Sequence, residues 1–236
     1  MIDIDPEALP EGDEKVRAVR SMFDAIAPRY DLVNRVMTFR MDVGWRRKTA
    51  RALRLPAGSR VLDLACGTGD FCRELRKHDL SPIGIDLSFG MLAAGTTGAP
   101  LVQADILRLP VPDHSVDGIT CGFALRNLVE LDAFFVELAR TVRPGGRIAL
   151  LEVAEPPNRL LRWGHGIYFG KVVPRIGGML SDPTAYRYLP KSVAYLPEPD
   201  ALLAALQAAG FHDATRTLFS GGISQLLLAT RDRPDA

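Results

Sequence analysis

A regular alternation of apolar strand-like segments and helical segments between residues 60 and 153 constrains the fold most. The strand-like segments are RVLDLAC (60–66), PIGID (82–86), LVQAD (101–105), VDGITCGF (116–123) and RIALLEV (147–153). Helical patterns separate several of them, at GDFCRELRKH (69–78), SFGMLAAG (88–95) and LDAFFVELARTV (131–142). Strands that alternate with helices of about ten residues form right-handed βαβ units, whose parallel sheet is covered on both faces.

The sequence therefore predicts one α/β domain with a Rossmann-like, doubly wound, seven-stranded and mostly parallel sheet. Residues 58–156 form the cofactor-binding core, and residues 196–231 finish the sheet with an antiparallel C-terminal edge strand. Residues 1–13 are predicted to be a mobile tail, and 14–55 an N-terminal helical cap of two or three helices interrupted at Pro28 and Gly44. We expect residues 158–195 to be a helical insertion that acts as a substrate lid.

Composition excludes several classes of function. The 29 Lys and Arg residues against 28 Asp and Glu leave a net charge of +1, which gives no reason to expect nucleic acid as a partner. Three cysteines lack the spacing of a disulfide framework or a zinc site, so no metal is predicted. The acidic N-terminus does not resemble a signal peptide and no apolar run reaches about 18 residues, so we expect a cytoplasmic protein, at most peripheral to a membrane.

A ligand-binding turn is predicted directly after the first strand-like segment. The strand itself is expected to end at Asp63 within that segment, and Gly67, Thr68 and Gly69 open the next helix, where glycines allow the backbone to approach a ligand. The turn departs from the dinucleotide pattern GxGxxG, because Cys72 stands where the third glycine would be. NAD and FAD are therefore disfavoured.

Acidic residues close three successive strands and indicate the ligand. Asp86 follows Gly69 by 17 residues, where a carboxylate accepts hydrogen bonds from ribose hydroxyls. Asp105 could accept the adenine amine while Ile106 packs on the ring. Each acid has a structural alternative: Asp63 or Asp86 could cap a helix, and Asp105 could hold a turn. Together they favour S-adenosylmethionine.

The chain resembles the C-methyltransferases of ubiquinone and menaquinone biosynthesis. The resemblance covers residues 16–230 and is carried by MFDAIAPRYDLVNRVMTFRMDVGWRR (22–47), VLDLACGTGD (61–70), GIDLSFGML (84–92), CGFALRNLVELDAF (121–134), RPGGRIALLE (143–152), YRYLP (186–190) and GGI (221–223). Asp42, Thr38 and Ala154 depart from the family's usual His, Ser and Ser, and the strand ISQLLLATR also differs from its usual form. The departures bear on the acceptor rather than on the cofactor.

The resemblance implies methylation of a ring carbon of a prenylated quinol, in the first place demethylmenaquinol. It also implies that Thr68, Asp86, Asp105, Ile106 and Cys121 line the cofactor, and we add Leu87 beside Asp86. Another phenolic or polyketide acceptor is the alternative within the same class. A cofactor-binding partner protein without catalysis is the alternative outside it.

Candidate catalytic residues follow the fourth and fifth strands, at the edge of the sheet where ligands of this fold bind. Arg126 could stabilise a phenolate and Asn127 could orient the acceptor, while Glu152 could be the general base. A structural ion pair for Arg126 and Glu152, and a helix cap for Asn127, are the alternatives.

Aromatic and basic residues outside the core suggest where the acceptor and the membrane lie. The predicted acceptor-binding residues are Tyr30, His165, Tyr168, Tyr186 and Tyr188. The run from Arg35 to Arg54 holds seven basic residues that could contact an anionic membrane, the alternative being a solvated helix face. The sequence leaves open whether the protein forms a homodimer.

Overall fold

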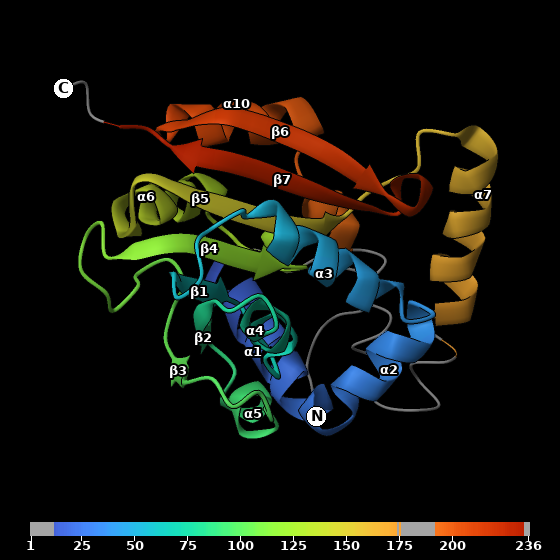
Figure 1. The fold of residues 1–236 in the computed structure, drawn as a ribbon. Helices are drawn as coiled ribbons and strands as arrows, with labels where there is room; N and C mark the ends of the chain where they lie inside the picture. The colour runs from blue at the N-terminus through green and yellow to red at the C-terminus, as the bar shows by residue number, and fades with distance from the viewer. Residues whose placement is uncertain (1–11, 174, 176–191, 234–236) are drawn as a thin grey trace.

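A seven-stranded sheet in the order β3-β2-β1-β4-β5-β7-β6 forms the centre of the molecule (Figure 1). The structure is a computed structural model that describes residues 12–173, 175 and 192–233. The strands are β1 Arg60–Leu64, β2 Ser81–Asp86, β3 Leu101–Gln103, β4 Val116–Gly122, β5 Val142–Val153, β6 Phe211–Phe219 and β7 Ser224–Arg231. The first five run parallel, and β7 pairs antiparallel with both β5 and β6. The predicted Rossmann-like, mostly parallel sheet is confirmed.

The antiparallel strand is the C-terminal one, as predicted, but it is not at the edge of the sheet. β7 is inserted between β5 and β6, so β6 is the outermost strand. The burial pattern explains this order, because the leucines at 226–228 of β7 are buried or half-buried on both faces, whereas every residue of β6 between its buried ends Phe211 and Phe219 is exposed or half-buried.

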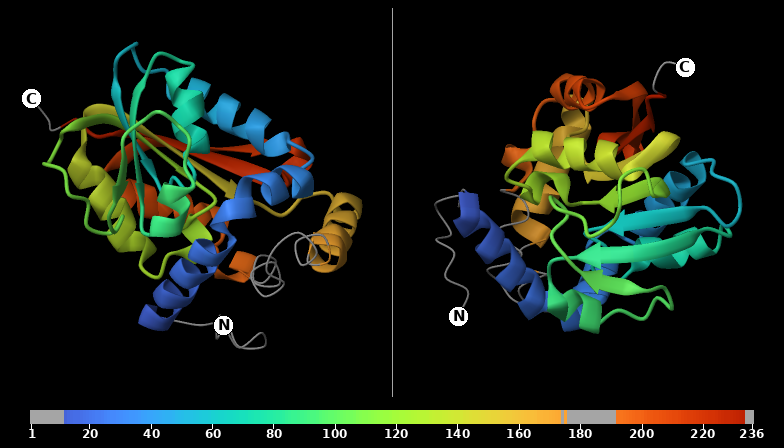
Figure 2. Two further views of the ribbon diagram at one scale, coloured as in Figure 1. Left: turned by 90° about the horizontal axis from the view of Figure 1, so that it is seen from below. Right: turned by 90° about the vertical axis from the view of Figure 1, so that its left-hand side faces the viewer.

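Helices cover both faces of the sheet (Figure 2). On one face, helices α6 Leu131–Thr141 and α10 Pro199–Ala208 bury Phe134, Leu138 and Leu206 against β4, β5 and β7. On the other face, α3 Met41–Ala52 and α4 Asp70–Arg76 bury Trp45 and Phe71. A fully buried side chain of this size contributes about 1.5–3 kcal/mol, so the two layers hold the sheet rigid beneath the sites at its edge.

The N-terminal cap consists of α1 Gly12–Ile26, the 3₁₀ turn η1 Ala27–Arg29, α2 Tyr30–Met37 and α3. It forms its own apolar cluster around Met22, Ile26 and Val33, against which α5 Phe89–Ala93 packs through Met91. The expected interruption at Gly44 is wrong: α3 runs through Gly44, where the missing side chain costs propensity without breaking the helix.

The insertion after β5 begins with α7 Arg159–Ile167, which continues into a π-helical turn, η3 Tyr168–Val172. Asn158 caps α7, because its Oδ1 accepts the N–H groups of Leu160 and Leu161 at 2.9 and 3.2 Å. Short 3₁₀ turns at η2 Leu125–Asn127, η4 Val193–Tyr195 and η5 Ser220–Gly222 complete the described chain. Within the described ranges, no helix is long and apolar enough to cross a membrane.

Candidate active site

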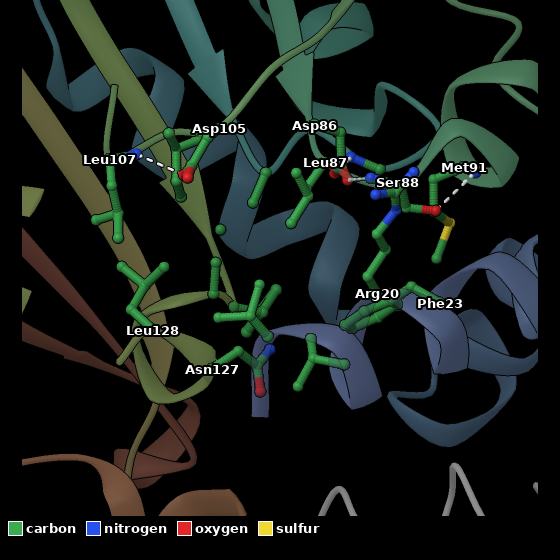
Figure 3. Close-up of a pocket in the computed structure, with 18 of the residues that line it drawn as sticks. Arg20, Phe23, Asp86, Leu87, Ser88, Met91, Asp105, Leu107, Asn127 and Leu128 are labelled. Atoms are coloured by element: carbon green, nitrogen blue, oxygen red, sulfur yellow. Dashed lines mark hydrogen bonds between the residues drawn. The ribbon is translucent and has the colours of Figure 1, made fainter. Parts of the chain in front are cut away.

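A cavity of about 150 Å³ lies at the carboxyl ends of β1, β2 and β4, under α1 (Figure 3). Five predicted cofactor residues line it: Gly67, Asp86, Leu87, Asp105 and Ile106. They come together because the carboxyl ends of neighbouring parallel strands meet at one edge of a doubly wound sheet.

Asp86 is positioned by backbone groups. Its Oδ2 accepts the Gly67 N–H and its Oδ1 the Ser88 N–H, both at 2.8 Å. Burial raises the pKa of this carboxyl, although both hydrogen bonds oppose the change. Each carboxylate oxygen has a second lone pair, so Asp86 can still accept two ribose hydroxyls. Ser88, and not Asp86, is the N-cap of α5, since its hydroxyl accepts the Met91 N–H at 3.1 Å.

Gly67 leaves room for a ligand. It lines the cavity with a φ of +56°, and a Cβ added to it would meet no atom within 4 Å. The main chain is thus open to the carboxylate end of an amino-acid ligand. On the opposite side, Ile106, Leu107 and Leu128 give an apolar slot beside Asp105, whose Oδ1 accepts the Leu107 N–H at 2.9 Å. Sites for a carboxylate, a ribose and a ring, in this order from Gly67 past Asp86 to Asp105, fit S-adenosylmethionine.

The remaining four predicted cofactor residues do not line this cavity. Asp63 is buried in β1, where it accepts the Thr120 hydroxyl at 2.9 Å and the Cys72 thiol, and burial raises its pKa to about 7. Cys121 is buried in the sheet, where desolvation raises its pKa well above the usual value. The Thr68 hydroxyl points away to Asp31. Their position in the structure suggests support of the loop rather than ligand contact.

Gly69 also acts through the backbone. It is the N-cap of α4 with φ of +83°, and a Cβ there would lie 2.8 Å from the side chain of Thr97. Both the positive φ and the crowding require glycine.

Sequence reasoning missed the individual residues that α1 supplies as the roof of this cavity. Val16, Val19 and Phe23 line it at helical spacing, and Arg20 adds a charge. The apolar period of this segment predicts the helix, but a contact with strands far away in the sequence has no local signal.

A second, larger cavity of about 610 Å³ adjoins the first and is lined mostly by apolar and aromatic side chains. Phe23, Tyr30 and Phe123 line both cavities and therefore mark their junction. Burial raises the pKa of the Tyr30 phenol, which keeps it neutral. Tyr30, His165 and Tyr168 are thus brought to one cavity, whereas Tyr186 and Tyr188 lie outside the described residues.

His165 presents an unpaired nitrogen in this cavity. Its Nε2 is buried and has no hydrogen-bond partner among the residues described, and its ring lies 4.3 Å from that of Phe169. Burial lowers the pKa of the imidazole, with Glu155 opposing the change. The ring is therefore neutral and able to accept a proton near pH 7.

Arg126 and Glu152 form a buried ion pair between η2 and the end of β5. Glu152 also accepts the Arg126 and Val153 backbone N–H groups at 3.3 and 2.8 Å. Arg126 further donates to the Phe123 carbonyl at 2.8 Å and to Ser192 Oγ at 3.1 Å. Arg126 lines the larger cavity and Asn127 the smaller one, while Glu152 lines neither. This geometry favours the ion-pair alternative for Glu152.

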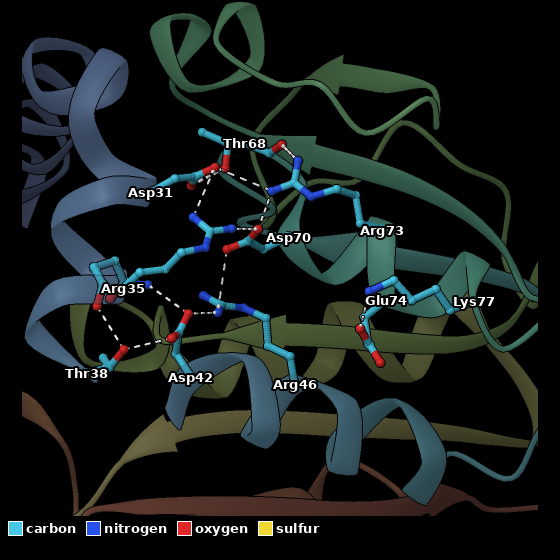
Figure 4. Close-up of polar contacts among 11 residues, drawn as sticks. Asp31, Arg35, Thr38, Asp42, Arg46, Thr68, Asp70, Arg73, Glu74 and Lys77 are labelled. Carbon is cyan, nitrogen blue, oxygen red and sulfur yellow. Dashed lines mark hydrogen bonds and ion pairs between the residues drawn. The ribbon is translucent and has the colours of Figure 1, made fainter. Parts of the chain in front are cut away.

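A network of charges joins the N-terminal cap to the cofactor loop (Figure 4). Asp70, at the start of α4, pairs with Arg35 at 2.9 Å, with Arg46 at 3.5 Å and with Arg73. Opposite charges lower the pKa of Asp70 although its burial raises it. Asp31 of α2 accepts the Thr68 hydroxyl at 2.6 Å. The network places Tyr30, next to Asp31, against the cofactor loop.

Solved structures share this fold. An S-adenosylmethionine-dependent methyltransferase of Thermotoga maritima has a TM-score of 0.64 at 15% identity and covers 90% of this chain and 99% of its own. Phosphoethanolamine N-methyltransferase 2 of Haemonchus contortus, solved with S-adenosyl-L-methionine, has a TM-score of 0.56 at 14% identity over 79% of this chain and 53% of its own.

Relatives found by sequence have a higher identity to this chain than these solved structures. Demethylmenaquinone methyltransferases of Roseiflexus castenholzii and Deinococcus radiodurans are each 41% identical, covering 92% and 90% of this chain and 95% and 93% of their own. The ubiquinone/menaquinone biosynthesis C-methyltransferase UbiE of Geobacter sulfurreducens is 36% identical over 90% of this chain and 88% of its own. Fold, cavity and relatives together define an S-adenosylmethionine-dependent methyltransferase. The chain belongs to the ubiE/COQ5 methyltransferase family, which it matches over residues 11–231.

Proposed function

We propose that the enzyme methylates a ring carbon of a prenylated quinol, with demethylmenaquinol as the acceptor. The observation that carries this proposal is the junction of the two cavities at Phe23, Tyr30 and Phe123. A flat ring held between these aromatic side chains lies next to the cofactor cavity, and about 610 Å³ of mostly apolar space extends beyond it for a tail. The names of the relatives agree with such an acceptor.

Positioning and exclusion of water supply most of the catalysis in this proposal. S-adenosylmethionine, when bound, supplies an electrophilic methyl group. The aromatic residues at the junction hold the ring carbon in line with it and keep the site dry.

His165 is the proposed general base. Its unpaired Nε2 takes the phenolic proton, directly or through water, which raises the electron density at the neighbouring ring carbon. Arg126 is proposed to stabilise the resulting phenolate, since it lines the same cavity. Water then accepts the proton that leaves the methylated carbon, which restores the aromatic ring, and His165 returns its own proton to the phenolate oxygen.

Glu152 is proposed as a positioning residue. It lines neither cavity, and its oxygens accept hydrogen bonds from Arg126 and Val153. Its carboxylate therefore orients the guanidinium and is not free to act as the base. Asn127, on the cofactor side, is proposed to help place the ring next to the methyl group.

Membrane contact through the run from Arg35 to Arg54 stays a prediction, and fewer basic residues of the run are available for it than the sequence suggests. Arg35 and Arg46 turn inward to Asp70. The exposed basic residues of the run are Arg40, Arg47, Lys48, Arg51 and Arg54.

Purified enzyme tests the proposed acceptor. With S-adenosylmethionine and chemically reduced quinols, we expect turnover of demethylmenaquinol and weaker turnover of the same ring without its tail, followed by mass spectrometry of the product. Deletion of the gene should leave a quinone one methylene lighter in the cell. An unchanged quinone pool, or preference for an unprenylated phenol, would reject the quinol and retain methyl transfer.

A further inference from the structure

Large apolar side chains project into solvent from α2 and α7. The most exposed are Leu160, Phe39 and Trp163, at 73%, 70% and 68% of their full surface. We define the apolar rim as the following six exposed residues of α2, α7 and the turn after α2: Leu32, Val36, Phe39, Leu160, Trp163 and Ile167. A group of large exposed apolar side chains of this kind marks a site of interaction.

The rim on α7 follows from helical geometry. Leu160, Trp163 and Ile167 are spaced three and four residues apart, so they share one face of the helix. None of the residues of α7 is buried, so the domain core does not use this face. Leu161, on the neighbouring face, lines the acceptor cavity.

The C-terminal end of α2 lies near the π-helical turn η3 that continues α7 (Figure 1). The Tyr168 hydroxyl donates to the Met37 carbonyl at 2.8 Å, and the Tyr168 ring lies 5.6 Å from that of Phe39. Phe39 and Leu160 are exposed and also line the acceptor cavity. The apolar rim therefore borders the mouth of that cavity.

We propose that the apolar rim docks on the surface of an anionic lipid bilayer and opens the acceptor cavity toward it. The proposal rests on the proposed function for its acceptor, whose tail would pass from the bilayer into the cavity without crossing water. An apolar face combined with flanking cations is what binds a peripheral protein to such a surface.

Charge favours a bilayer over a second copy of the chain. Arg40 follows the rim on α2, and Arg159, Arg162 and Lys171 flank it on α7 and η3, all of them exposed. Glu155 is an exposed acid at the same border. In a symmetric dimer the cations of one rim would face those of the other and the cavity mouths would be closed. Anionic lipid headgroups complement these charges instead.

Sedimentation with vesicles tests the docking. Wild-type protein should bind vesicles that contain phosphatidylglycerol. Two double variants, Leu32→Gln with Val36→Gln and Trp163→Gln with Ile167→Gln, should each weaken binding at least about tenfold. Val136→Gln with Leu218→Gln, which alters exposed apolar residues of α6 and β6, is the matched control and should bind like wild type.

Two further measurements separate the electrostatic part of vesicle binding from the methyl-transfer reaction. Arg40→Gln with Arg159→Gln should weaken binding to anionic vesicles about twenty-fivefold, at about fivefold per cation, and leave binding to phosphatidylcholine unchanged. None of the residues altered on the rim or in this charge pair lines either cavity. Turnover of a soluble short-chain quinol should therefore stay at the wild-type level, while turnover of a long-chain quinol in vesicles falls with binding.

Three results would overturn the docking: no binding by wild type, equal binding by wild type and both rim variants, or a wild-type dimer that dissociates on rim substitution without any vesicle binding. Rim-dependent vesicle binding without turnover of any quinol would support the docking and reject the proposed acceptor, so the two failures are distinguishable.

Discussion

The Asp24 carboxylate accepts a 2.6 Å hydrogen bond from the Ser88 hydroxyl, which joins α1 to the first turn of α5. The same Oδ1 accepts the Gly90 N–H at 2.8 Å. Ser88 lines the cofactor cavity and also donates its N–H to Asp86. Asp24 thus holds the roof of the cavity at one end.

Replacement of Asp24 should weaken cofactor binding. Asp24→Ala removes an acceptor for two donors and frees α1, so we expect the Kd for S-adenosylmethionine to rise about tenfold in titration calorimetry. Asp24→Asn keeps a neutral acceptor and should show a smaller loss. Asp132→Ala, which removes an exposed carboxylate from α6, is the control. Equal affinity of Asp24→Ala and wild type would contradict this role.

Lys15 holds the other end of α1 and should make stability depend on pH. Its Nζ donates to the Leu128 carbonyl at 3.0 Å and lies 3.6 Å from the centre of the Tyr195 ring. Burial lowers its pKa to about 8 from 10.5. The unfolded chain therefore binds more protons between these values, and the free energy of unfolding should rise with pH across this window.

Lys15→Met removes this titration. The free energy of unfolding of wild type relative to Lys15→Met should increase by up to about 3 kcal/mol between pH 8 and 10.5. Urea unfolding of both proteins at several pH values measures the difference, in which the titrations of the other groups cancel. Parallel pH profiles would show that Lys15 is not desolvated.

The sequence predicts the cofactor site where its geometry follows from topology. Asp86 and Asp105 come at or after the ends of parallel strands, and such ends meet at one edge of the sheet. Asp63 differs because it lies one residue before β1 ends, inside the ladder, where side chains alternate between the two buried faces. The sequence pattern does not distinguish an acid at the last residue of a strand, such as Asp86, from an acid one residue earlier, such as Asp63.

Long-range contacts explain what the sequence does not predict. Lys15 reaches a carbonyl 113 residues away and Asp24 a hydroxyl 64 residues away. The period of α1 predicts its apolar face but not the strands that this face covers. The same holds for Arg126 and Glu152, 26 residues apart, for which catalysis and an ion pair were equally compatible with the sequence.

Asp42, which departs from the family's usual histidine, should be important for stability. It is fully buried, pairs with Arg46 at 2.5 Å and accepts the Thr38 hydroxyl at 2.7 Å. Asp42→Ala leaves the buried Arg46 with Asp70, at 3.5 Å, as its one ion-pair partner among the described residues, so we expect a loss of about 3 kcal/mol in urea unfolding. Asp113→Ala, which breaks the exposed pair with Arg140, should cost less than about 1 kcal/mol. Similar losses for both variants would contradict the argument.

His165 should set the acid limb of the pH–rate profile. Because burial lowers its pKa below 6.5, the imidazole is neutral at pH 7 and becomes protonated, and so unable to act as a base, only in more acidic solution. We expect kcat/KM of the wild type to decrease when the pH is lowered through the pKa of His165. His165→Gln should lower kcat about a hundredfold and abolish this decrease at acidic pH. Tyr168→Phe is the matched control, because the Tyr168 hydroxyl is engaged with the Met37 carbonyl and its loss should keep the limb. An unchanged limb in His165→Gln would assign the base to another residue of the acceptor cavity.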